Sequence, residues 1–149
     1  YPTDKVTVAT KFAAVPWRTK PIDVVNACRK SVERLGGRKI DLYQIHFPNA
    51  WSNAEYWDGL AMAYDEGLVK SVGVSNYGVD AIRACHKALK DRGVPLATNQ
   101  IQYSLLYTWP EKNGLLQACR DLGVDVLSYS PLALGCLTGK YGKDSPPPG

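Results

Sequence analysis

The chain has 149 residues, of which 45% are hydrophobic and 21% are charged, and its formal net charge is +4. This size and composition are those of one ordinary globular domain, and no apolar run reaches the roughly 18 residues that a membrane-spanning helix needs. The basic residues are interleaved with acidic ones and form no block of like charge, so neither nucleic-acid binding nor membrane insertion is expected.

Hydrophobic periodicity predicts that strands and helices alternate along the chain. The predicted elements, in chain order, are a strand at 5–12, a helix at 20–37, a strand at 41–47, a helix at 52–69, a strand at 70–76, a helix at 79–93, a strand at 95–104, a helix at 110–123 and a strand at 124–132. Strict alternation of this kind indicates a parallel sheet with right-handed crossovers.

Local patterns support two of the predicted helices. The apolar stripe of the first helix is predicted at Ile22, Val25, Cys28, Val32 and Leu35. Ser52 and Glu55 form a capping-box pattern at the start of the second helix.

The four cysteines are far apart and form no C-x-x-C pair; they are Cys28, Cys85, Cys119 and Cys136. This spacing predicts neither a metal site nor a disulfide framework, and it indicates a reducing, intracellular compartment. The first three fall on the apolar sides of predicted helices, where a free cysteine behaves as a small hydrophobic residue.

Two folds fit the alternation: an open doubly wound sheet and a (β/α)8 TIM barrel. An open dinucleotide-binding sheet should carry G-x-G-x-x-G after its first strand, and no such motif follows residue 12. A barrel instead brings the carboxyl ends of all strands to one mouth, so chemically capable side chains should recur at strand ends.

Polar side chains do lie toward the carboxyl ends of all five predicted strands. They are Lys11, His46, Ser75, Asn76, Asn99, Gln100, Ser128, Tyr129 and Ser130. Taken singly, each has a structural explanation, such as a solvated lysine or a strand-end histidine that forms a structural hydrogen bond. Their recurrence on five successive strands favours an α/β fold of the (β/α)8 barrel type.

Five segments resemble the aldo-keto reductases, in the style of the bacterial and plastid-type reductases that are related to potassium-channel β-subunits. The segments are ATKF, DLYQIHFP, GLVKSVGVSNY, NQIQYSLL and SYSPLALGCLTGKY. They cover essentially the whole chain in the right order. The resemblance implies a (β/α)8 barrel that reduces the carbonyl of a small aldehyde or ketone by hydride transfer from a nicotinamide cofactor.

The family performs this reaction with a tetrad of Asp, Tyr, Lys and His. Lys11 matches the lysine, which lowers the pKa of the tyrosine, and His46 matches the histidine, which hydrogen-bonds the substrate oxygen. Channel β-subunits place asparagine at the position of His46, so the histidine favours the enzymatic branch.

The resemblance also implies a site for NADP(H), with NAD(H) not excluded. Ser75, Asn76 and Gln100 match residues that bind the nicotinamide carboxamide, and Tyr129 matches the aromatic residue that stacks on the ring. The residues that match the loop over the pyrophosphate are Ser130, Pro131, Leu132, Ala133, Gly135 and Lys140. Trp51 is a candidate wall of the substrate pocket, with simple packing as the alternative.

The tetrad Asp and Tyr should lie upstream of residue 6, and they are not in this chain. The last β/α unit, with the segment that holds the 2′-phosphate, is also missing. Because a complete barrel needs about 250 residues, we expect residues 1–149 to be one partial barrel domain, units three to seven of a longer protein.

Three functions remain open at this point. The first is a reductase in the full-length protein, the second is a nicotinamide-nucleotide sensor like the channel β-subunits, and the third is an inactive truncated product. We expect the segment alone to reduce no carbonyl and the protein to reside in the cytoplasm or a chloroplast. The sequence predicts no particular oligomeric state.

Overall fold

The computed structural model describes residues 6–51 and 53–146, and in this part of the chain it contains a five-stranded parallel sheet. The strands are β1 (Ala9–Phe12), β2 (Ile40–Ile45), β3 (Val69–Ser75), β4 (Leu96–Gln102) and β5 (Asp125–Tyr129). The helices are α1 (Pro21–Arg34), α2 (Asn53–Asp65), α3 (Val79–Asp91), α4 (Trp109–Lys112) and α5 (Leu115–Leu122), with a 3-10 segment η2 (Ala133–Thr138) after β5.

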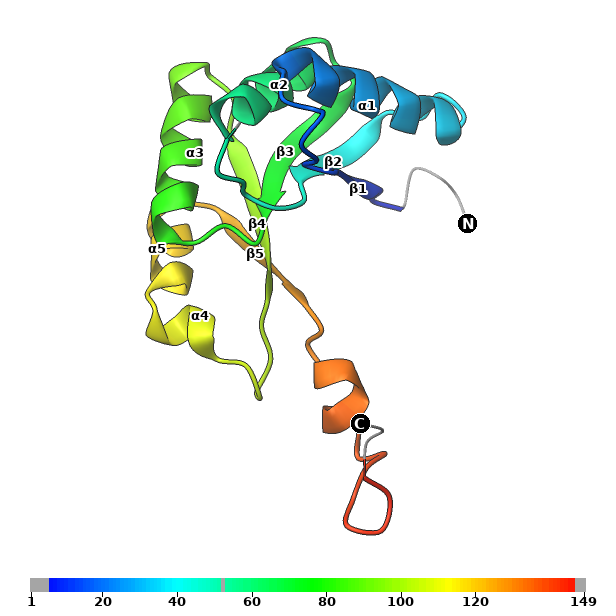
Figure 1. The fold of residues 1–149 in the computed structure, drawn as a ribbon, viewed down its shortest axis with the longest axis vertical. Coiled ribbons are helices and arrows are strands. Elements are labelled where there is room, and N and C mark those ends of the chain that lie inside the picture. The colour runs from blue at the N-terminus through cyan, green and yellow to red at the C-terminus, as the bar shows by residue number, and fades with distance from the viewer. Residues whose placement is uncertain (1–5, 52, 147–149) are drawn as a thin grey trace.

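The strands are hydrogen-bonded in chain order, β1-β2-β3-β4-β5. A doubly wound sheet reverses its strand order at a switch point, whereas consecutive order is the winding of a (β/α)8 barrel. Figure 1 shows the helices following one another around the outside of the curved sheet. The predicted barrel-type architecture with five β/α units is therefore confirmed.

The two faces of the sheet have different chemistry because side chains alternate along each strand. Phe12, Tyr43 and Val72 face the helices and are buried, and the Tyr43 hydroxyl donates a hydrogen bond to Val24 O in α1. The opposite face holds Lys11 and Gln44, which are register partners on β1 and β2. In a (β/α)8 barrel, the face opposite the helices is the inner one.

Gly73 allows the strands to approach one another on the inner face. A Cβ atom at this position would lie 2.2 Å from Thr98 Oγ1 and 3.0 Å from Thr98 O. The first distance is too short for any carbon–oxygen contact and the second is at the limit, so this register of β3 against β4 favours glycine.

The predicted helix over 110–123 is divided into α4 and α5. Gly114 between them adopts a left-handed φ of 80°, which a continuing helix does not permit. Asn113 Oδ1 accepts a hydrogen bond of 3.0 Å from Leu115 N and so satisfies a free donor at the start of α5. The pair Asn113–Gly114 is a turn signal in the sequence, but the apolar periodicity continues across it, so a single helix was predicted.

The stripe predicted for α1 is partly wrong. Val25 and Cys28 are buried as expected, but Ile22 and Leu35 are 40% and 38% exposed. Val24 and Ser31 are buried in their place. Ser52 of the predicted capping box lies outside the described residues.

In the described part of the chain the sheet is not closed, because β1 pairs only with β2 and β5 only with β4. Leu127 on β5 is 37% exposed as a consequence. None of the helices described is both long and apolar enough to cross a membrane.

Candidate active site

A cavity of about 280 Å³ opens where the carboxyl ends of the strands converge. It is lined by Lys11, His46, Phe47, Ser75, Asn76, Gln100 and Tyr129. These residues come from five successive strands, or directly follow them, and span more than a hundred positions of the sequence. The structure thus brings together six of the residues that the sequence analysis singled out, and adds Phe47.

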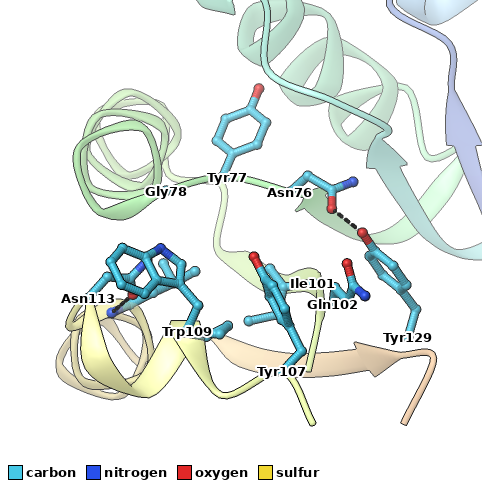
Figure 2. A pocket seen from close by; sticks show the side chains of 11 residues that line it. Asn76, Tyr77, Gly78, Ile101, Gln102, Tyr107, Trp109, Asn113 and Tyr129 are labelled. Atoms are coloured by element: carbon cyan, nitrogen blue, oxygen red, sulfur yellow. Dashed lines mark hydrogen bonds between the residues drawn. The ribbon is translucent and has the colours of Figure 1, made fainter. Parts of the chain in front are cut away.

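Asn76 is the centre of the hydrogen bonding at this cavity. Its backbone has a left-handed φ of 62°, which asparagine tolerates better than most residues. Its Nδ2 donates to His46 O at 3.2 Å and to Ser75 Oγ at 3.1 Å. Its Oδ1 accepts from the Tyr129 hydroxyl at 3.0 Å, the bond drawn in Figure 2. One side chain therefore connects the ends of β2, β3 and β5.

The backbone of Gln100 secures the end of β3 from the other side. Its carbonyl oxygen accepts from Asn76 N and from Ser75 Oγ, each at 2.8 Å. Its own side-chain amide has no hydrogen-bond partner among the described residues, although it lines the cavity. This amide is therefore free to bind a ligand that has both a donor and an acceptor.

His46 is held by its backbone and by its neighbour. His46 N donates to Phe12 O at 3.0 Å, and the imidazole stacks on Phe47 with ring centroids 4.5 Å apart. Desolvation, and then the nearby Lys11 ammonium, lower the pKa of His46. At neutral pH the ring is therefore uncharged, with one N–H donor and one acceptor nitrogen.

The Lys11 ammonium lines the same cavity and has no carboxylate within 4.0 Å among the described residues. No carboxylate neutralises this charge, so it acts on the neighbouring groups of the cavity, including His46. Lys11 and His46 together provide a positive charge and a neutral hydrogen-bond donor at one place.

Three residues of the predicted strand-end set do not line the cavity, namely Asn99, Ser128 and Ser130. Asn99 and Ser128 pair in register with Val74 and Ile101, on the helix side of the sheet, and neither lines the cavity. Because side chains alternate, the residue beside an inward one must point outward. The alternation of side chains along a strand could have excluded Asn99 and Ser128 from the site on sequence grounds alone.

The segment predicted to lie over a pyrophosphate follows β5 and does not line this cavity. Ser130, Ala133 and Leu134 have left-handed φ values of 51°, 48° and 55°, and Figure 1 shows η2 projecting away from the sheet. Leu134 is 88% exposed, and the Lys140 ammonium lies over the Tyr141 ring, 5.4 Å from its centroid. The role of Ser130–Lys140 stays a prediction.

Trp51 also lies apart from the cavity. It is 54% exposed, and its backbone N–H donates to Asn49 Oδ1 at 2.9 Å. Phe47, which the sequence analysis did not select, lines the cavity together with Tyr129.

A second cavity of about 210 Å³ shares Asn76 and Tyr129 with the first. Figure 2 shows that it continues past Gln102 toward the aromatic side chains of Tyr107 and Trp109. The hydrogen bond between Asn76 and Tyr129 therefore lies at the border of both cavities.

Comparison with known proteins gives a family and a fold. All of residues 1–149 match the model of the Aldo/keto reductase family. The chain is 46% identical to the chloroplastic pyridoxal reductase of Arabidopsis thaliana, over 98% of this chain and 41% of that protein.

Solved structures show the same architecture. The Bombyx mori aldo-keto reductase in complex with NADP has a TM-score of 0.76 and 29% identity, over 99% of this chain and 48% of that one. The aldo/keto reductase from Klebsiella pneumoniae in complex with NADP and acetate has a TM-score of 0.77 and 27% identity, over 93% of this chain and 47% of that one. The chain spans less than half the length of each of these relatives. Since the family match extends over every residue and the neighbours share the β/α winding, the chain belongs to the aldo/keto reductase family.

Proposed function

We propose that this chain is part of a longer reductase that converts a small aldehyde or ketone to an alcohol with NADPH. One observation carries the proposal: a single cavity is lined by groups suited to a nicotinamide and by groups suited to a carbonyl oxygen. The first are Asn76, Gln100 and Tyr129, and the second are Lys11 and His46.

The free groups of the cavity fit a nicotinamide. The unpartnered Gln100 amide offers donors and an acceptor to the carboxamide of the cofactor, Asn76 Oδ1 offers its second lone pair as an acceptor, and the Tyr129 ring offers a flat face. A cavity of about 280 Å³ is at the small end of ligand pockets, which suits a ring and a small carbonyl. When bound, the nicotinamide supplies the hydride. The likeness to neighbours that hold NADP favours NADPH over NADH.

Lys11 and His46 act on the carbonyl oxygen, which gains negative charge as the carbon is reduced. The neutral imidazole donates an N–H hydrogen bond to that oxygen, and the ammonium stabilises the developing charge through space. The proton donor of the family is a tyrosine that we place outside this chain, together with the aspartate of the tetrad. Lys11 is then the group that lowers the pKa of that tyrosine.

For the substrate we propose an aldehyde attached to an aromatic ring, such as pyridoxal. The 46% identity to a pyridoxal reductase supports this class. Phe47 supports it independently, because its ring is 51% exposed and lies beside His46, where it can pack against a flat substrate.

We also propose a reducing compartment, the cytoplasm or a chloroplast. All four cysteines are free thiols, including the exposed Cys136, and the plant relative is described as chloroplastic.

The test is to express the complete protein and follow NADPH oxidation with pyridoxal as substrate. We expect turnover with NADPH and weaker turnover with NADH. Binding of NADP(H) without turnover of any aldehyde or ketone would instead indicate a nucleotide sensor. The segment 1–149 alone should reduce nothing, since it lacks the tyrosine.

A further inference from the structure

Asn99 is a buried amide at a position of β4 where packing alone calls for an apolar residue. Its exposed fraction is 0%, and its register partners on β3 and β5 are Val74 and Val126. It points to the helix side of the sheet, away from the cavity that Gln100 lines. A buried carboxamide is costly unless its atoms are hydrogen-bonded, so the partners of Asn99 indicate its role.

The Asn99 amide forms two hydrogen bonds to the backbone of one residue, Tyr77. Asn99 Nδ2 donates to Tyr77 O at 3.0 Å, and Asn99 Oδ1 accepts from Tyr77 N at 3.4 Å. These two groups belong to the peptide units on either side of Tyr77. The Asn99 side chain therefore pairs with the backbone N–H and C=O of Tyr77, in the way that a neighbouring strand pairs with the backbone in a sheet.

Tyr77 is also secured by its side chain. The ring is fully buried, and its hydroxyl accepts from Trp57 Nε1 at 3.1 Å and donates to Asn53 Oδ1 at 3.4 Å. The residue is thus fixed at its backbone by β4 and at its hydroxyl by α2.

The residue immediately before Tyr77 is Asn76, with its left-handed φ of 62°. Asparagine tolerates this conformation but also adopts others, so hydrogen bonds to the neighbouring backbone are needed to fix it. Asn76 N donates a hydrogen bond to Gln100 O, and Tyr77 N donates one to Asn99 Oδ1. Two adjacent residues of β4 therefore fix the backbone conformation of Asn76 together.

We propose that Asn99 is a positioning residue for cofactor binding: through the Tyr77 backbone it holds Asn76 in the conformation that directs its amide into the cavity. This inference rests on the proposed function, in which Asn76 binds the nicotinamide. A carboxamide suits the task because it is short and carries a donor and an acceptor in one plane. Leucine would fill the space but leave Tyr77 N and O without partners.

The experiment is a double-mutant cycle on the complete protein, with the Kd for NADPH measured by fluorescence titration and Tm measured in parallel. Asn76→Ala and Asn99→Leu should each weaken NADPH binding about tenfold, the scale of one lost network hydrogen bond. In the Asn76→Ala background, Asn99→Leu should weaken binding less than about twofold further, because the two residues act as a unit. Leu96→Ala, a buried substitution in the same strand, is the matched control: it should lower Tm and leave Kd unchanged.

Two results would overturn the inference while leaving the proposed function intact: wild-type affinity in Asn99→Leu, or losses that multiply in the double variant. Wild-type affinity in Asn76→Ala would overturn both.

The Asn99→Asp variant tests the same inference independently, through the pH dependence of NADPH binding. A protonated carboxyl has the same donor and acceptor as the amide, whereas the carboxylate has no donor for Tyr77 O. We expect the affinity of this variant to match wild type at low pH and to fall behind it as the pH rises. An affinity as poor as that of Asn99→Leu at every pH would contradict the assignment.

Discussion

Tyr129 and Asn76 lie 53 residues apart in the sequence, and the Tyr129 hydroxyl donates a 3.0 Å hydrogen bond to Asn76 Oδ1. Their strands, β5 and β3, are not neighbours in the sheet, because β4 lies between them. The bond therefore bridges across a strand at the mouth of the sheet and gathers two of the groups proposed to hold the nicotinamide.

The ring of Tyr129, more than its hydroxyl, should determine cofactor affinity. Tyr129→Phe keeps the stacking face, so we expect the Kd for NADPH to rise less than about threefold. Tyr129→Ala removes the face, and since stacking on an aromatic residue contributes about 1–3 kcal/mol, Kd should rise by about five- to 150-fold. Titration of both variants with NADPH checks this, and equal losses would rule out stacking as the source of affinity.

The Lys11 ammonium should act electrostatically on His46. It is one of two causes that lower the pKa of the imidazole, the larger being desolvation. In Lys11→Met the charge is gone, so the pKa of His46 should rise toward 6.5 but remain below it. An NMR titration of the His46 ring measures the shift. Lys140→Met, which removes a lysine that does not line the cavity, should leave the pKa of His46 unchanged.

Asp41, near the start of β2, should make stability depend on pH far from the site. The hydrogen bond from Lys70, then that from Val8 N, lowers the pKa of Asp41 from its ordinary 3.8 to about 2. A lowered pKa stabilises the folded state above the ordinary value, and this stabilisation is lost as the pH falls from about 4 to about 2.

Asp41→Asn should therefore unfold at lower urea concentration than wild type at pH 7, and the difference should shrink between pH 4 and pH 2. Its kcat and Kd for NADPH should equal those of wild type, because the residue is at the opposite end of the strand from His46. A difference that is constant with pH would show that the charge of Asp41 is not responsible.

Gly73 should tolerate no side chain. An added Cβ would meet Thr98 Oγ1 at 2.2 Å, so Gly73→Ala must displace the Thr98 side chain, with its hydrogen bond from Gln44, or move β3 away from β4, and we expect a loss of about 1–3 kcal/mol in the free energy of unfolding. Gly142→Ala is the control, since a Cβ there meets nothing within 4 Å and should change stability by less than about 0.5 kcal/mol. Urea denaturation compares the two, and equal stability of both variants would contradict the tight register.

Sequence patterns predicted the sheet well because hydrophobic period and strand ends are local properties. Lys11, His46, Ser75, Asn76, Gln100 and Tyr129 each end a recognisable strand, and parallel winding alone brings such ends together. The strand-end pattern also placed Asn99 in the site, although adjacent residues of a strand face opposite sides of the sheet and Gln100 faces the cavity.

Other features were missed because the periodicity of apolar residues does not report turns or long-range contacts. The break between α4 and α5 follows from the left-handed Gly114, which a periodicity of apolar residues does not detect. The selection of Phe47 over Trp51 depends on how the loop after β2 folds back. The buried bonds of Asn99 to Tyr77 join residues 22 positions apart and became visible only with the structure.

We propose, as the central claim, that His46 donates a hydrogen bond to the carbonyl oxygen of the substrate while the residues around it bind the cofactor. The most direct measurement is kcat and NADPH Kd of the complete protein with and without His46→Ala, using pyridoxal as substrate. Loss of one positioned donor should lower kcat about a hundredfold or more and leave the NADPH Kd within about twofold of wild type. A His46→Ala variant that turns over at the wild-type rate would contradict the account.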